Sequence, residues 1–133
     1  RAAIFEDRKI LLVRENDGRW SLPAASVHVI VSVRENTIKE VREEAGLDVI
    51  PERIIAVQDR AKHNLPVYAY GVCKIFVLCT AVGGHFVPNI ETTESRCFGE
   101  DELPELAGEK NTEEQVRMCF AAFRDENWKP LLD

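Results

Sequence analysis

The sequence predicts an α+β fold in which a mixed β-sheet is packed between helices, in three layers. The predicted elements follow the order strands, helix, several strands, helix, which is typical of a sheet covered on both faces. The chain has 133 residues, of which 45% are hydrophobic, and this suffices for one core. We therefore expect residues 1–133 to form a single domain. Because the chain begins at Arg1 rather than at a methionine, we also expect it to be a fragment that lacks an N-terminal segment.

The first predicted strands are short and are separated by polar turns. Residues 2–5 and 9–14 are apolar segments on either side of a charged turn, and we expect both to be strands. Residues 20–22 form a third, short strand that ends at Pro23, since proline cannot donate to a sheet ladder. The loop that follows, residues 24–31, is unusually apolar.

The first helix has clear start and stop signals. Ser32 followed three residues later by Glu35 forms a capping box, which predicts that the helix begins there. Gly46 can adopt the positive φ at which helices commonly end. Val41 and Ala45 recur on one face with Ile38, so this face suits burial against the sheet.

The second half of the chain predicts more strands and a second helix. Residues 67–82 are rich in β-branched and aromatic residues and predict one long strand or two strands broken at Gly71. Tyr68 and Tyr70 would lie on that strand, where sheet packing is their commoner role and stacking on a base is the alternative. The remaining predictions are strands at residues 53–59, 86–87 and 96–98, a turn at 83–84, a helical turn at 101–106, and a helix from Thr112 to about Phe123.

Composition excludes several classes of function. The net charge of −6 argues against broad nucleic-acid binding and against docking on an anionic membrane, since both require a basic surface. The longest apolar stretch, residues 67–82, is interrupted by Lys74 and is too short to span a bilayer. No C-x-x-C spacing is present, so we expect buried, reduced thiols in a cytoplasmic protein at Cys73, Cys79, Cys97 and Cys119.

Three glutamates of the first helix point to a metal site. Residues three and four apart share a helix face, so Glu40, Glu43 and Glu44 are expected to point the same way. Like charges repel at this spacing, whereas a divalent cation bound across the carboxylates would reverse the interaction. An acidic helix face is most often only solvated, and the helix alone leaves both interpretations open.

The residues around this helix resemble the signature of the Nudix (MutT-like) hydrolase family, G-x5-E-x7-R-E-U-x-E-E-x-G-U, in which U is aliphatic. The chain has the lead-in W-S-L-P at residues 20–23, and a later stretch, E-S-R-C-F at 94–98 followed by D-E-L-P at 101–104, also resembles the family. It is most similar to members that act on ADP-ribose or CDP-alcohols. The signature residues that it keeps are Glu40, Val41, Glu43, Glu44, Gly46 and Leu47.

The resemblance implies a Nudix-like α/β/α sandwich that hydrolyses a nucleoside diphosphate linked to another group, with Mg²⁺ as cofactor and Mn²⁺ as a substitute. It implies that Glu40, Glu43 and Glu44 hold the metal, with Glu40 acting as ligand or base. Family members often form homodimers, so a homodimer is a further expectation for this chain. The further candidates, each with a plain surface role as its alternative, are Lys39 to orient a carboxylate, Glu94 or Glu91 to complete the site, and His63 to contact substrate.

The chain departs from the family pattern in the loop before the helix. Ala24 and Ala25 replace the Gly pair, Val31 replaces the first Glu, and Lys39 replaces the Arg. An alanine in the left-handed region costs about 1–2 kcal/mol, so the loop either has this strain or takes another shape. The alternative function is therefore a catalytically weakened module that binds a nucleotide or a protein without cleaving it.

Overall fold

The structure is a computed structural model that describes residues 1–133, and it contains a seven-stranded sheet with two α-helices. The elements in chain order are β1 (Ala2–Glu6), β2 (Lys9–Glu15), β3 (Trp20–Ser21), α1 (Val33–Ala45), β4 (Leu47–Asp59), the 3₁₀ helix η1 (Arg60–Lys62), β5 (Cys73–Gly84), β6 (Thr92–Phe98), α2 (Glu113–Arg124) and β7 (Leu131–Leu132).

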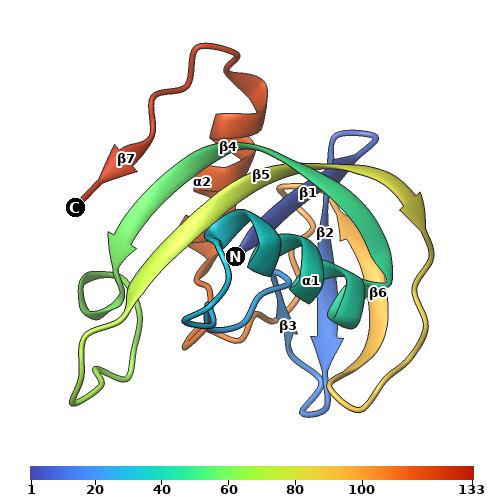
Figure 1. Cartoon of the computed structure of the whole chain (residues 1–133), viewed down its shortest axis with the longest axis horizontal. Helices are drawn as coiled ribbons and strands as arrows, with labels where there is room; N and C mark the ends of the chain where they lie inside the picture. The colour runs from blue at the N-terminus through green and yellow to red at the C-terminus, as the bar shows by residue number, and fades with distance from the viewer.

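The sheet is mixed, as the sequence predicts. Its strand order is β3-β2-β1-β5-β4-β7, and β6 pairs with β2 outside this path. The pairs β1–β5 and β4–β7 are parallel, whereas the other pairs are antiparallel. Figure 1 shows the long, curved strands β4 and β5 running across the molecule, with α1 in front of the sheet and α2 behind it. The predicted α+β architecture of a sheet between helices is therefore confirmed.

Each helix packs on its own hydrophobic cluster. On the α1 side, Val41 and Ala45 are fully buried against sheet residues that include Ile4 and Val77. On the α2 side, the helix contributes Val116, Cys119, Phe120 and Ala122 to a second cluster with sheet residues such as Ile10, Leu12 and Phe76. Alternate residues of β2 supply the two clusters because successive side chains of a strand point to opposite faces.

The boundaries of the first helix agree with its capping signals. The Ser32 side chain accepts a hydrogen bond from the Glu35 backbone N–H, and the Glu35 carboxylate accepts one from the Ser32 N–H. The helix ends at Gly46, which has φ +69° and donates its N–H to the Arg42 carbonyl oxygen. The same box, between Thr112 and Gln115, begins α2.

Several predicted boundaries in the second half of the chain are wrong. Strand β4 begins at Leu47 rather than at residue 53. Pro51 lies within this strand, where the pairing with β5 shifts its register between Pro51 and Arg53. Residues 67–72 form a loop, so β5 begins only at Cys73, and it continues through Gly83 and Gly84, which pair with β4 instead of making a turn. Strand β6 begins at Thr92, residues 86–87 are not a strand, and residues 101–106 form no helix.

The four cysteines are all free, but they are not all buried. Cys79 and Cys119 lie in the core, as predicted, whereas Cys73 is exposed and Cys97 is partly exposed. The prediction of a buried thiol at Cys73 is wrong because this residue is the first of β5, next to the loop. Neither helix has the length and apolar character needed to cross a membrane.

Candidate functional site

A pocket of about 850 Å³ opens beside α1. One side of its wall is formed by α1 and by the loop before it, and another by the end of β2 and the segment before β6. The loop between η1 and β5 supplies a further part, together with Glu109 and Lys110. Segments that are far apart in the sequence therefore meet at this pocket.

Three polar side chains of α1 form a row along the pocket wall. Asn36, Glu40 and Glu44 are four residues apart, and all three line the pocket. Residues at this spacing lie one above the other on a helix. The adjacent Val41 and Ala45 are anchored in the core, so the row is fixed at the edge between core and pocket. The sequence singled out the two glutamates but missed Asn36, whose position four residues before Glu40 was the available signal.

Glu44 is the most perturbed carboxyl group of the pocket. Its pKa is raised to about 7, mainly by burial. The Ala24 N–H and the charge of Arg1 act against this rise, and the charges of Glu91 and Glu40 add to it. The backbone N–H of Ala24 donates to Glu44 Oε2 at 2.8 Å, which fixes the orientation of the carboxylate. A bound cation would favour the ionised form, because it would add an opposite charge beside the carboxylate.

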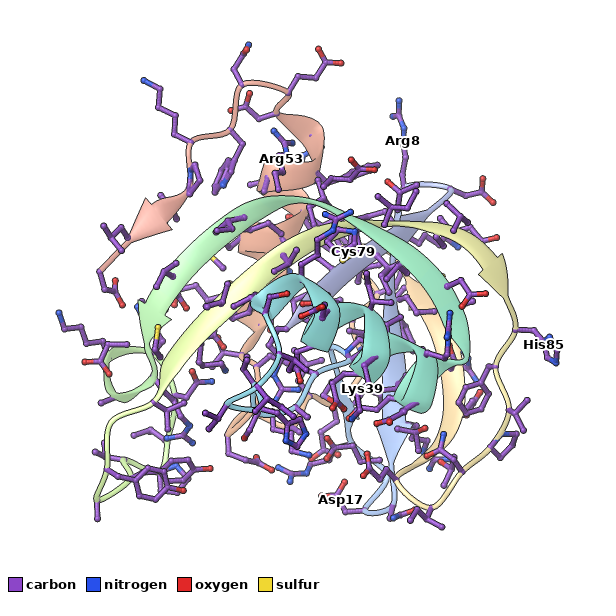
Figure 2. The ribbon with its side chains drawn as sticks, viewed as in Figure 1. Arg8, Asp17, Lys39, Arg53, Cys79 and His85 are labelled. Carbon is purple, nitrogen blue, oxygen red and sulfur yellow. The ribbon has the colours of Figure 1, made fainter.

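Lys39 and Glu43 lie outside the pocket wall. Lys39 Nζ is 3.3 Å from Glu40 Oε1 and 3.2 Å from Glu43 Oε1, and it therefore links the two carboxylates. Glu40 is almost completely buried, whereas about half of the Glu43 side chain is exposed. Figure 2 shows Lys39 below the ribbon of α1, on the side where Asp17 also lies. Glu40 and Glu44 therefore both face the pocket, whereas Glu43 lies at its exposed side and is joined to Glu40 through Lys39.

The donor set of the pocket fits a hard divalent cation. Glu40, Glu44 and Glu91 offer carboxylate oxygens, which are the ligands that Mg²⁺ takes in proteins. The buried Asn36 Oδ1 has no hydrogen-bond partner, and it is a further hard oxygen at the same wall. No three His, Cys, Asp or Glu side chains lie close enough together to hold a metal ion without moving. The fit therefore rests on the chemistry of the donors.

The remaining predicted residues are divided between the pocket and the surface. Glu91 lines the pocket. Glu94 lies on β6 opposite Arg14, where it forms ion pairs with Arg96 at 2.5 Å and with Arg14 at 4.0 Å, and it does not line the pocket. His63 also lies outside, with Nε2 at 2.9 Å from the Asp133 carboxylate. The structure thus brings Glu91, and not Glu94 or His63, to the carboxylates of α1.

The altered loop takes a shape that needs no left-handed alanine. Ala24 and Ala25 are not among the residues with positive φ. Both line the pocket, and the Ala24 N–H contacts Glu44 as described above. The apolar side chains of Val29 and Ile30 are almost fully exposed. The loop therefore approaches the carboxylates although it lacks the glycine pair. Its two alanines adopt no left-handed conformation, so the expected strain is absent.

Basic side chains line the same pocket, and sequence reasoning missed them. Lys110 Nζ lies 2.5 Å from Glu15 Oε1, and both residues belong to the wall. Lys74 is buried and donates to Asn64 Oδ1 and to the Lys110 carbonyl oxygen. The pKa of Lys74 is lowered to about 7, mainly by burial and in smaller part by the positive charges of Arg1 and Arg60. These residues lie on separate elements, so no spacing in the sequence marks them.

Comparisons with known proteins find relatives along the whole chain. "Putative ADP-ribose pyrophosphatase YjhB" of Bacillus subtilis (strain 168) is 40% identical over 134 aligned residues, which include all of this chain. The chain spans 64% of the length of that relative. No family model matches the sequence.

Solved structures also match almost the whole chain. The crystal structure of an ADP-ribose pyrophosphatase from Streptococcus suis 89-1591 is 50% identical, with a TM-score of 0.93, and the match covers 100% of this chain and 96% of that one. The crystal structure of a UDP-X diphosphatase is 32% identical, with a TM-score of 0.90, and the match covers 98% of this chain and 64% of that one.

Proposed function

Because the chain belongs to the Nudix hydrolase family, we propose that it cleaves the diphosphate bond of a nucleoside diphosphate linked to another group, with Mg²⁺ as cofactor. The observation that carries the proposal is the pair Glu40 and Glu44, which face a pocket together with Glu91. Relatives named as an ADP-ribose pyrophosphatase and a UDP-X diphosphatase support this substrate class.

The α1 row would hold the metal. Glu40 and Glu44 are the proposed ligands, and Glu91 and the unpaired Asn36 Oδ1 are the nearest further oxygen donors along the wall. When bound, Mg²⁺ supplies positive charge to the diphosphate oxygens and assists the activation of water. Lys39 is proposed to position Glu40, since its ammonium group lies 3.3 Å from Glu40 Oε1.

The side chains of the pocket supply the remaining chemistry. Hydrolysis forms a bond from the water oxygen to one phosphorus and breaks the bridging P–O bond, so the water must lose a proton. The carboxylates of Glu40 and Glu44 in the pocket wall are the proposed acceptors of this proton. Arg1, Lys74 and Lys110 line the wall and would attract the negative diphosphate.

The alternative function, a module that binds a nucleotide or a protein without cleaving it, is not favoured. The relatives described above are named as pyrophosphatases or as a diphosphatase, which are hydrolases. The free cysteines fit the reducing cytoplasmic setting that we propose. A homodimer remains a prediction from the family.

A substrate panel tests the proposal. ADP-ribose, CDP-choline and a UDP-sugar are incubated with the protein in Mg²⁺ or in EDTA, and the products are separated by ion-exchange chromatography. We expect at least one compound to give a nucleoside monophosphate and a second phosphorylated product in Mg²⁺, and none to react in EDTA. Failure to cleave any member of the panel, by protein that melts cooperatively, contradicts the proposal.

A further inference from the structure

Two tyrosines of the η1–β5 loop line the same pocket as the carboxylates of α1. Tyr68 and Tyr70 belong to residues 67–72, which the sequence predicts as strand and the structure shows as loop. Figure 1 shows this loop at the lower left of the view, whereas the C-terminal half of α1, which carries Glu40 and Glu44, lies to the right of the chain start. The pocket therefore extends from an acidic part to an aromatic part, and Arg1 lines it as well.

The tyrosines are stacked on a buried arginine. The Arg60 guanidinium lies 3.5 Å from the centre of the Tyr68 ring, and the Tyr68 and Tyr70 ring centres are 5.4 Å apart with 30° between their planes. Arg60 is held in place, because it donates to the Pro66 carbonyl oxygen at 2.6 Å and to the Glu109 carbonyl oxygen at 3.0 and 3.2 Å. Arg60 is thus fixed both to the start of the loop that carries the tyrosines and to the segment around Glu109.

The outer end of the stack is open. Tyr70 is 70% exposed, and Tyr68 is 37% exposed. A single exposed tyrosine on a loop needs no special explanation. Two tyrosines that already stack on each other, one of them against a fixed cation, in the wall of a pocket, are instead a preorganised aromatic surface. Such surfaces bind planar groups by offset stacking, with little loss of side-chain freedom.

Cations near the stack suit a ligand that is both planar and anionic. Lys74 and Lys110 line the pocket, and Lys74 is a buried residue of β5 that donates to Asn64 Oδ1. A nucleotide combines an aromatic base with phosphates, so it can use both parts of the pocket. A sugar phosphate lacks the base and would use only the charged part.

We propose that the stack of Arg60, Tyr68 and Tyr70 is the platform for the nucleobase of the substrate, with the diphosphate directed toward Glu40 and Glu44. This inference rests on the proposed function and specifies which end of the substrate lies where. Stacking reads the flat face of a base and not its edges, so purine and pyrimidine nucleotides are both accepted.

Replacing Tyr70 by alanine tests the platform. We expect the KM for ADP-ribose and for a UDP-sugar to rise about tenfold in Tyr70→Ala, because loss of one base–aromatic stack weakens binding by this order. The kcat is expected to change much less. The affinity for AMP, measured by calorimetry in EDTA, falls by a similar factor, whereas ribose 5-phosphate binds equally to both proteins. Tyr70→Phe restores most of the lost affinity, since it keeps the ring.

Val67→Ala is the matched control, since Val67 is an exposed residue of the same loop and does not line the pocket. Equal AMP affinity and equal KM in wild type and Tyr70→Ala overturn the platform, as does an equal loss for ribose 5-phosphate. The AMP measurement does not require turnover. Tyr70-dependent AMP binding by a protein that cleaves no member of the panel would retain the platform and reject the proposed function.

Discussion

Replacing Glu44 by glutamine is expected to lower kcat for the nucleoside diphosphate substrate by about 100- to 10,000-fold. Glutamine keeps the shape of the side chain and one carbonyl oxygen, but it has neither the negative charge that binds a cation nor the basicity that accepts a proton. Glu44 lies in the pocket wall, where the Ala24 N–H orients it and burial raises its pKa to about 7. Steady-state kinetics at saturating Mg²⁺ measure the loss.

Two controls make this result specific. Glu43→Gln, on the same helix but outside the pocket wall, is expected to lose far less activity than Glu44→Gln. Thermal unfolding in EDTA at pH 8 should show Glu44→Gln to be at least as stable as wild type, because it removes a charge whose burial is unfavourable. Equal losses for the two variants would contradict the assignment of Glu44, as would wild-type activity in Glu44→Gln.

Replacing Gly46 by alanine is expected to destabilise the protein by about 2–5 kcal/mol. Gly46 has φ +69°, and a Cβ atom there would lie 2.1 Å from the backbone oxygen of His85 and 2.9 Å from its carbonyl carbon. The His85 side chain projects outward at the edge of the molecule (Figure 2), but its backbone closes against the end of α1. Backbone atoms cannot rotate away, so the loop after β5 must shift.

Gly71→Ala is the matched control for this prediction. Gly71 has no atom within 4 Å of an added Cβ, and its φ is not in the left-handed range. Chemical denaturation should show a change of about 0.5 kcal/mol or less for Gly71→Ala. A Gly46→Ala protein that is as stable as Gly71→Ala would show that the helix does not end in this geometry.

The sequence predicted those parts of the fold whose causes are local. Both helices begin at capping boxes that four consecutive residues define, and Gly46 marks the end of α1. The strands of the second half were harder, because β-branched and aromatic residues at 67–72 have strand propensity but lie in a loop. Whether such a segment joins a sheet depends on its partners, and the sequence does not show that β5 pairs with β4 only from Cys73 onward.

The candidate site was predicted from spacing only where it lies within one helix, and Glu91 was predicted from the family resemblance alone. Glu40 and Glu44 followed from spacing and from the family resemblance. Spacing could not show that Asn36 lines the pocket with Glu40 and Glu44 and that Glu43 does not, because that depends on how α1 packs on the sheet through Val41 and Ala45. The basic and aromatic parts come from segments brought together by folding.

Crystals soaked in Mn²⁺ test the central claim most directly, because manganese is a close substitute for Mg²⁺ and scatters anomalously. We expect an anomalous peak in the pocket, in contact with the carboxylates of Glu40 and Glu44, that is absent from crystals of Glu44→Gln. A peak held elsewhere by Glu43 and Glu94, or well-ordered carboxylates with no peak at saturating Mn²⁺, would contradict the account.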